Sequence, residues 1–220
     1  MTIKEAVNER HSVRQYNNIP IENEKEKELR DFIEAINDEN GLDIQFIVND
    51  SECFDSFLAH YGKFTNVQNY IAMVGNKQYP NLDETMGYFG EEIVLKAQTM
   101  GLNTCWVAGT FSKKKCKAQV GKDEKLLCVI SIGYGENQGQ NHKSKPLEKL
   151  CKADLSTAPE WFKEGVDGAL KAPTALNQQK FVITLDGDNA KITSKGGAMT
   201  KIDLGIVKYN FEAASGRKVL

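Results

Sequence analysis

The sequence has no long apolar stretch, few histidines and few cysteines, and each shortage excludes a class of function. None of its hydrophobic runs approaches the roughly 18–20 residues that a membrane-spanning helix needs. The three histidines (His11, His60 and His142) are scattered, and the five cysteines include no C-x-x-C pair, so metal-type spacing is absent. Charges of both signs nearly cancel, to a net charge of -2, which argues against a general nucleic-acid or membrane-surface role.

The N-terminal residues 1–10 are charged and amphipathic, without the apolar centre of a signal peptide, so we expect a cytoplasmic protein. An odd number of widely spread cysteines is typical of reduced thiols in that compartment. A length of 220 residues with 40% hydrophobic residues suits a single compact unit over residues 1–220, with 1–150 and 151–220 as candidate sub-units.

Hydrophobic periodicity predicts a mixture of helices and strands. The capping-box pair Thr2 and Glu5 opens the first helix, and Gly101 is expected to follow the longest one as its left-handed C′ residue. We expect a small-residue turn at 104–111 and a polar, irregular linker at 137–157. The predicted helices cover residues 2–9, 24–38, 50–61, 83–100, 112–119, 158–172 and 199–213, and the predicted strands cover 44–49, 70–75, 126–134, 181–185 and 191–194.

The segment 10–16 places two guanidinium groups and a hydroxyl at alternate positions, as Arg10, Ser12 and Arg14. In an extended segment these three side chains point to the same side. Guanidinium groups match phosphate oxygens, and a hydroxyl adds another donor, so this pattern suits a phosphate site. On spacing alone, an ordinary solvated segment whose arginines cover the surface is the more common explanation.

A second stretch, residues 171–179, combines small and amide side chains. Its proline disfavours helical geometry at Ala172, so a helix must end there. Small residues allow a flat ligand to approach the backbone, and amides carry both a donor and an acceptor for the edge of a heterocycle. The alternative is an ordinary loop with polar caps. The candidate residues are Pro173, Thr174, Ala175, Asn177 and Gln179.

Three stretches together resemble the FMN-dependent nitroreductase family. The Arg-x-Ser-x-Arg-x-aromatic pattern at 10–16 resembles the family's phosphate-binding segment. Residues 172–179 are similar to its Ala-Pro-Ser-Ala-x-Asn-x-Gln-Pro element, and 101–109 to its Gly-Leu-Gly-Thr-x-Trp-x-Gly stretch. The resemblance covers most of the chain and favours a divergent subgroup of the family.

This resemblance implies an α+β, three-layer α/β/α fold with a mainly antiparallel sheet, and one non-covalently bound FMN per chain. It implies electron transfer from NAD(P)H to small flat acceptors, such as nitro compounds or quinones, by a ping-pong mechanism, with no obligatory catalytic side chain. Asn177 and Gln179 would face the flavin ring, and Lys63 would offer a cation near its pyrimidine end. The remaining implied contacts are Arg10, His11, Ser12 and Arg14 at the phosphate, Val107, Ala108 and Gly109 along the ring, and Pro173, Thr174 and Ala175 beside it.

The sequence departs from the family pattern in two respects. Lys180 replaces the proline, and the Ala-Pro element comes late in the chain rather than soon after the arginine segment. Residues 32–48 and 166–183 also share a helix–turn–strand pattern, which suggests an internal duplication, although chance explains it equally well. We therefore expect a homodimer or an internally pseudo-dimeric monomer. The alternatives are a flavin-binding carrier or sensor without turnover, and a decayed site on a fold that serves protein association.

Overall fold

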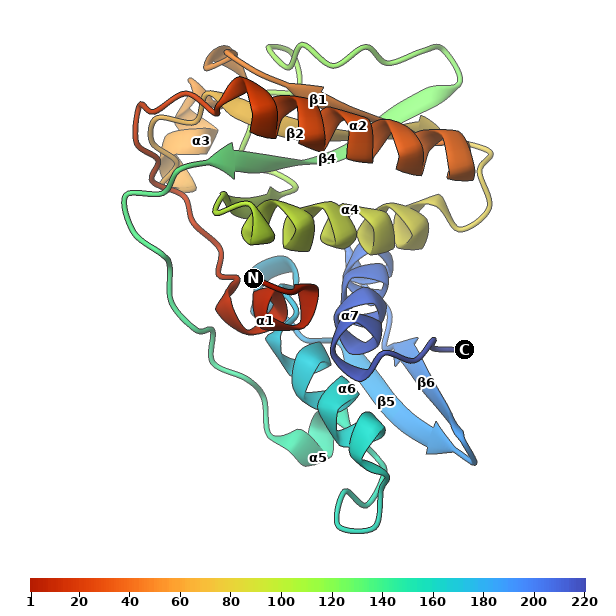
Figure 1. Ribbon diagram of the computed structural model, residues 1–220. Helices are drawn as coiled ribbons and strands as arrows, with labels where there is room; N and C mark the ends of the chain where they lie inside the picture. The colour runs from red at the N-terminus through yellow and green to blue at the C-terminus, as the bar shows by residue number, and fades with distance from the viewer. The chain divides into compact units, whose positions relative to one another are not determined.

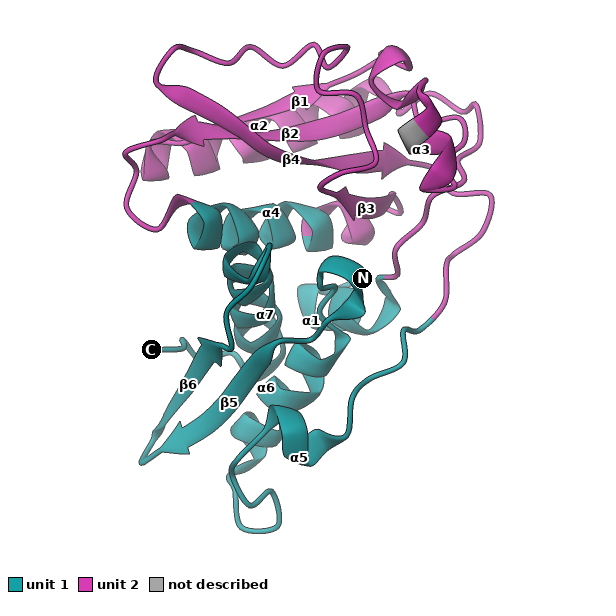
Figure 2. Ribbon diagram, turned by 180° about the vertical axis from the view of Figure 1, so that it is seen from behind, with its two compact units in different colours: residues 1–10, 83–95, 141–220 teal, residues 11–82, 96–140 magenta. Residues whose placement is uncertain are grey.

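A computed structural model describes residues 1–57 and 59–220 of the protein (Figures 1 and 2). Its helices and strands form two units, and each unit is built from segments that interleave along the chain. Unit 1 contains residues 1–10, 83–95 and 141–220, and unit 2 contains residues 11–82 and 96–140. The expected single compact unit over residues 1–220 and its candidate sub-units 1–150 and 151–220 stay predictions. Among the described residues, no helix has the length and apolar character that crossing a membrane requires.

Helices and strands follow one another in a mixed order. The helices are α1 (Ile3–Glu9), α2 (Asn23–Asn40), α3 (Phe57–Tyr61), α4 (Leu82–Thr99), α5 (Leu147–Leu150), α6 (Glu160–Lys171) and α7 (Thr200–Ser215), with short 3₁₀ turns η1 (Glu52–Phe54) and η2 (Ala175–Asn177). The strands are β1 (Asp43–Ile47), β2 (Asn69–Asn76), β3 (Asn103–Val107), β4 (Glu124–Gly133), β5 (Phe181–Asp186) and β6 (Asn189–Ser194).

Unit 2 is built on a four-stranded antiparallel sheet of order β1-β2-β4-β3. Strand β2 lies inside the sheet and is buried along its whole length except at Asn76, which explains its continuous apolar sequence. Helix α2 is fixed to β1 by Asn37, whose side chain donates to the Ile44 carbonyl and accepts from the Ile44 amide, at 2.8 and 2.9 Å. Gly41 ends this helix in the left-handed conformation (φ 63°), which glycine adopts without a Cβ clash.

Unit 1 packs α6 against α7 around an aromatic pair, Phe162 and Phe211, whose ring centroids are 5.8 Å apart. The hairpin of β5 and β6 pairs Phe181 with Ser194 at one end and Asp186 with Asn189 at the turn. Helix α1 contributes Ala6 and Val7, which are buried in a small cluster with Leu95 of α4.

Helices α4 and α7 approach each other closely because a glycine lies on each at the contact. A Cβ atom on Gly87 would lie 2.1 Å from the Ile202 carbonyl oxygen, and a Cβ on Gly205 would lie 2.0 Å from the Glu84 carbonyl oxygen. Both distances are shorter than any real Cβ contact, so only glycine fits at either position.

Most predicted elements are confirmed, including the capping box of α1, the left-handed Gly101 (φ 77°) after α4, and both strands of the last hairpin. The predicted helix at 50–61 is wrong, since this stretch forms η1 and the separate short helix α3. The predicted turn at 104–111 is wrong in its first half, because residues 104–107 belong to the largely buried strand β3 and pair with β4.

The predicted helix at 112–119 is also wrong, because other segments take its backbone groups. The Lys117 amide donates to the Tyr70 hydroxyl at 2.8 Å, and the Gln119 amide donates to the Gln45 side chain at 2.8 Å. These bonds to β2 and β1 replace the i→i−4 bonds that a helix would need.

Substituting Gly205 by alanine should lower the free energy of unfolding by about 1–3 kcal/mol or more, because the new methyl group would overlap the α4 backbone. Urea unfolding followed by circular dichroism measures the change. Gly109→Ala is the matched control, since a Cβ there meets no atom within 4 Å, and it should stay within about 0.5 kcal/mol of the parent. Equal effects of the two variants would contradict the close α4–α7 contact.

Candidate functional site

In unit 2, the part of the arginine segment after Arg10 runs beside β3. Ser12 forms a parallel bridge with Thr104, and the Val13 amide donates to the Thr104 carbonyl at 3.0 Å. Tyr16 fixes the other end, because its buried hydroxyl donates to the Val13 carbonyl and contacts Ser131 Oγ, both at 2.8 Å. Two motifs that lie far apart in the sequence, the arginine segment and the stretch that contains β3, are therefore neighbours.

Arg14 and Lys63 lie on adjoining stretches of backbone. The Thr65 amide donates to the Arg14 carbonyl at 3.0 Å, and Gln15 Nε2 donates to the Lys63 carbonyl at 2.8 Å. The Arg14 side chain is exposed and lies over the Phe64 ring, 5.9 Å from its centroid. Among the ion pairs of the described residues, none involves Arg14 or Lys63, so both cations face solvent without a carboxylate partner.

The chain after β3 adjoins the same region. Val107 is 2% exposed and packs in the core, Ala108 is half-buried, and Gly109 is exposed. A Cβ on Gly109 would meet no atom within 4 Å, so the protein itself gives no packing reason for glycine here. Beside it, a Cβ on Gly62 would lie 2.8 Å from the Thr110 side chain, which shows how closely the Lys63 turn and this stretch approach.

Arg10 belongs to unit 1, where its guanidinium is buried. Nη2 donates to the Lys171 carbonyl at 3.1 Å, and Nε lies 3.7 Å from Glu91 Oε1. Glu91 is fully buried and also accepts from Asn210 Nδ2 at 2.9 Å. The expectation that Arg10 lines up with Ser12 and Arg14 as a phosphate ligand does not match this environment, because its charge already faces a buried carboxylate.

The buried residues of the arginine segment are Arg10, Val13 and Tyr16, at every third position, so burial does not follow the alternation expected of a flat strand. The reason is local. Arg10 is the C-cap of α1, and the chain then turns to follow β3.

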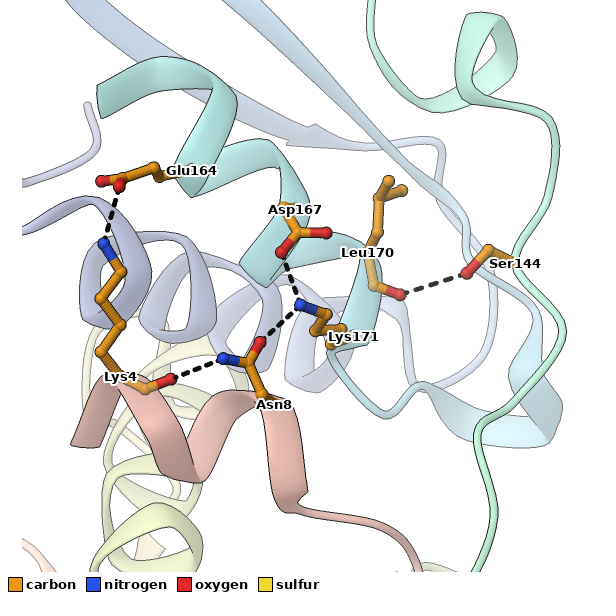
Figure 3. Close-up of polar contacts among 7 residues, drawn as sticks. All are labelled: Lys4, Asn8, Ser144, Glu164, Asp167, Leu170 and Lys171. Carbon is orange, nitrogen blue, oxygen red and sulfur yellow. Dashed lines mark hydrogen bonds and ion pairs between the residues drawn. The ribbon is translucent and has the colours of Figure 1, made fainter. Parts of the chain in front are cut away.

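Polar contacts between α1 and α6 involve Lys171, the residue whose carbonyl accepts from Arg10. Figure 3 shows the side-chain contacts of these two helices. Lys171 Nζ, at the end of α6, donates to Asn8 Oδ1 and to Asp167 Oδ2, both at 2.5 Å. One helical turn away, Lys4 Nζ forms an exposed ion pair with Glu164 at 2.8 Å (Figure 3). Lys171 therefore contacts α1 through its side chain, which donates to Asn8, and contacts Arg10 through its carbonyl.

The second predicted stretch forms a strained loop that Asp203 supports. Leu176, Asn177 and Gln179 all have a positive φ, of 52°, 51° and 41°, which is uncommon for residues other than glycine. Asp203, in the first turn of α7, accepts from the Ala175 amide at 2.9 Å and from Gln178 Nε2 at 2.8 Å. Burial raises the pKa of the Asp203 carboxyl, and these two hydrogen bonds oppose the shift.

Within this loop, the amides expected at the flavin edge contact the protein. Gln179 is buried, and its Nε2 donates to the Lys143 carbonyl at 3.0 Å and to Asn177 Oδ1 at 2.6 Å. Its Oε1 accepts from the Lys145 amide at 2.8 Å. Asn177 Nδ2 also donates to the Lys143 carbonyl, at 2.9 Å, but Asn177 is exposed. Gln179 therefore positions the loop, whereas Asn177 presents an amide at its surface.

The remaining candidate residues of this loop, Pro173, Thr174 and Ala175, are half-buried. Thr174 Oγ1 accepts from the Gln179 amide at 3.1 Å, and Pro173 follows the extended Ala172 that ends α6, as the sequence predicts. His11, in unit 2, is half-buried, and a Cβ on Gly139 would lie 2.6 Å from its Cβ.

Sequence reasoning missed Glu91, Asp203 and the segment 143–145. No spacing links these residues to the loop or to Arg10, so only the three-dimensional structure reveals them. A polar depression elsewhere in unit 2 contains none of the expected flavin-binding residues; it is lined by Asp43, Gln45, Gln119, Val120, Gly121 and Glu124.

Substituting Arg10 by alanine should lower the free energy of unfolding by about 3–5 kcal/mol, because it leaves Glu91 buried without its counter-charge. Chemical denaturation measures the loss. Lys4→Ala is the control at the same pair of helices, and removing its exposed ion pair should cost at most about 1 kcal/mol. A small effect of Arg10→Ala would show that the guanidinium is not needed inside unit 1.

Comparisons with known proteins agree with the fold. A family model described as "Putative TM nitroreductase" matches residues 2–215. A solved structure described as a putative nitroreductase from Thermotoga maritima covers 97% of this chain and 83% of its own, with a TM-score of 0.71 and 24% identity. Another, described as a putative nitroreductase in complex with FMN from Desulfovibrio desulfuricans, covers 69% of this chain and 96% of its own, with a TM-score of 0.53 and 16% identity. The search of curated proteins found no match.

The structural matches confirm the expected α+β class, and the sheet of unit 2 is antiparallel throughout. The family model spans nearly the whole chain, which is far more than any single motif could establish. The protein therefore belongs to this nitroreductase family, as the three motifs indicate.

Proposed function

We propose that the protein is an FMN-dependent oxidoreductase that takes electrons from NAD(P)H and reduces small flat electrophiles. Its family membership supports this proposal, as does a relative of the same fold that is described as an FMN complex. The observation that carries it is the bridge between Ser12 and Thr104, because that bridge joins the arginine segment to the stretch ending at Gly109.

The residues of unit 2 suit the two ends of FMN. A phosphate dianion needs cationic and hydroxyl donors, and Arg14 and Ser12 offer these at a partly exposed segment. A flat ring needs close access to the backbone, and Gly109 leaves open space where any other residue would place a side chain. Lys63, exposed on a neighbouring turn, adds a second cation.

Arg10 has a different role in this proposal from the one its motif implies. Its guanidinium is held by Glu91 and by the Lys171 carbonyl, so we assign it to the support of unit 1. Asn177 and the half-buried Pro173, Thr174 and Ala175 stay predicted ring contacts, and Gln179 holds their loop.

When bound, FMN would supply the redox chemistry between the nicotinamide and the acceptor. The protein contributes binding and orientation. Ser12 and Arg14 hold the phosphate, and the Val107–Gly109 backbone leaves the ring accessible. No side chain is assigned as acid or base, and stacking on an open ring face imposes little selection among flat acceptors, so a broad acceptor range follows.

Arg14→Ala should weaken FMN binding about ten- to hundredfold, because it removes a charge-assisted contact to the phosphate. Titration of apoprotein, followed by flavin fluorescence, gives the dissociation constant. Arg30→Ala is the matched control, since Arg30 is also a unit 2 arginine stacked on an aromatic ring, 5.1 Å from the Phe46 centroid. If both variants bind FMN like the parent, Arg14 does not hold the phosphate.

The same preparation tests turnover and stoichiometry. We expect one FMN per chain, bleaching of its visible absorbance by NAD(P)H, and recovery on adding a quinone. Tight flavin binding without bleaching would identify a carrier or sensor instead of an enzyme. A colourless protein that does not bind added FMN would contradict the proposal altogether.

Gly109→Val should abolish FMN binding and leave the free energy of unfolding nearly unchanged. The valine side chain would fill space that no protein atom occupies within 4 Å of the Cβ position, so it would obstruct a ligand but not the fold. Paired measurements of FMN affinity and of urea unfolding separate the two effects. A variant that binds FMN normally would remove Gly109 from the site.

A further inference from the structure

Two cysteines from distant parts of the sequence lie together in unit 2. Cys53 lies in η1, and Cys116 lies in the turn that follows Ser112. The Ser112 amide donates to the Cys53 carbonyl at 2.8 Å, and the Ser112 carbonyl accepts from the Cys116 amide at 3.0 Å. This backbone connection brings the two residues together, and Cys116 packs against the buried cluster that contains Cys53.

Residues on both sides of the pair keep the two segments in place. Lys115 Nζ donates to the Asp55 carbonyl at 3.1 Å. Lys117 donates its amide to the Tyr70 hydroxyl at 2.8 Å and places its Nζ 3.2 Å from Asp50 Oδ1. Hydrogen bonds and an ion pair therefore connect the segment around η1, strand β2 and the 112–119 turn on both sides of the two cysteines.

The two thiols differ in exposure and in acidity. Cys53 is fully buried, whereas Cys116 is partly exposed. A hydrogen bond from the Cys53 thiol lowers the pKa of Cys116 to about 6, with help from the Ala118 amide and the Tyr70 hydroxyl, while burial and the Asp50 carboxylate oppose the shift. The same hydrogen bond, together with burial, raises the pKa of Cys53.

Because the pKa of Cys116 is lowered and that of Cys53 is raised, the accessible cysteine is the more readily ionised of the two. Thiolates, not thiols, are the nucleophiles in cysteine oxidation, and accessible low-pKa cysteines beside a second cysteine are the ones that react reversibly. Among the other cysteines, Cys105, Cys128 and Cys151 are all buried.

We propose that Cys116 is a peroxide-reactive cysteine and that Cys53 is its resolving partner. In the first step the Cys116 thiolate attacks a hydroperoxide; the S–O bond forms, the O–O bond breaks, and the alkoxide leaves after taking a proton from solvent. In the second step Cys53 attacks Cys116 Sγ; the S–S bond forms, the S–O bond breaks, and hydroxide leaves as water with the Cys53 proton. The two sulfurs lose two electrons in total, and the peroxide is reduced to water and an alcohol.

This inference does not depend on bound flavin, and nothing in the family assignment requires it. The disulfide would connect η1 to the 112–119 turn, and external thiols would reverse it by exchange.

Hydrogen peroxide at one equivalent should consume two of the five thiols of the purified full-length protein. Peptide mass spectrometry without reduction should then find Cys53 linked to Cys116. Cys151→Ser is the control and should retain the linkage. A linkage between two copies of Cys116, or loss of other thiols first, would overturn the assignment.

Cys53→Ala gives a second measurement that does not require disulfide formation. Alkylation of Cys116 by iodoacetamide should be half-maximal near pH 6 in the parent, because its rate follows the thiolate fraction, which increases as the pH is raised through the pKa. In Cys53→Ala the profile should move to higher pH, and dimedone should trap Cys116 as a sulfenic acid after peroxide. Identical pH profiles in the two proteins would refute the role of Cys53.

Discussion

The buried ion pair between Arg10 and Glu91 is the interaction on which unit 1 most depends. A charged group inside a protein is costly unless an opposite charge and hydrogen bonds replace its hydration. Glu91 has both, from Arg10 and from Asn210, and so connects α1, α4 and α7. The second guanidinium contact, to the Lys171 carbonyl, extends this connection to the end of α6 and to the start of the loop that follows.

That loop shows how local strain and long-range bonds offset each other. A left-handed backbone costs roughly 1–2 kcal/mol for a residue with a Cβ, somewhat less for asparagine, and three such residues occur between 176 and 179. Bonds to Asp203 and to the Lys143 carbonyl hold them there. Strained backbone of this kind often occurs at binding sites, and here it leaves the Leu176 side chain fully exposed beside Asn177.

Local patterns in the sequence were enough to predict most of the elements. The capping box of α1, the glycine after α4 and the proline that ends α6 act within a few residues, so each could be recognised directly. The wrong predictions concern residues 50–61 and 104–119, where backbone groups bond to segments that are distant in the sequence, as Cys53 does to Ser112 and Lys117 to Tyr70. The same limit applies to the candidate site. The sequence offered Ser12 and Arg14 as candidate phosphate contacts, which stay predictions, but the carboxylate that pairs with Arg10 lies in α4.

The two neighbouring cysteines are a second feature that sequence spacing could not predict. Counting and spacing alone suggested unremarkable reduced thiols, because Cys53 and Cys116 share no short motif. Their proximity arises from one serine, whose amide and carbonyl each bond to one of the two cysteine backbones. No rule based on sequence spacing could have anticipated that contact.

The two glycines where α4 meets α7 have a consequence for the evolution of this fold. Correlated changes can usually rescue a contact, because a larger side chain on one helix is matched by a smaller one opposite. At Gly87 and Gly205 the facing atoms are backbone carbonyls, which no substitution can shrink. The two positions therefore cannot compensate for each other, and each should stay glycine independently in any descendant that keeps this helix crossing.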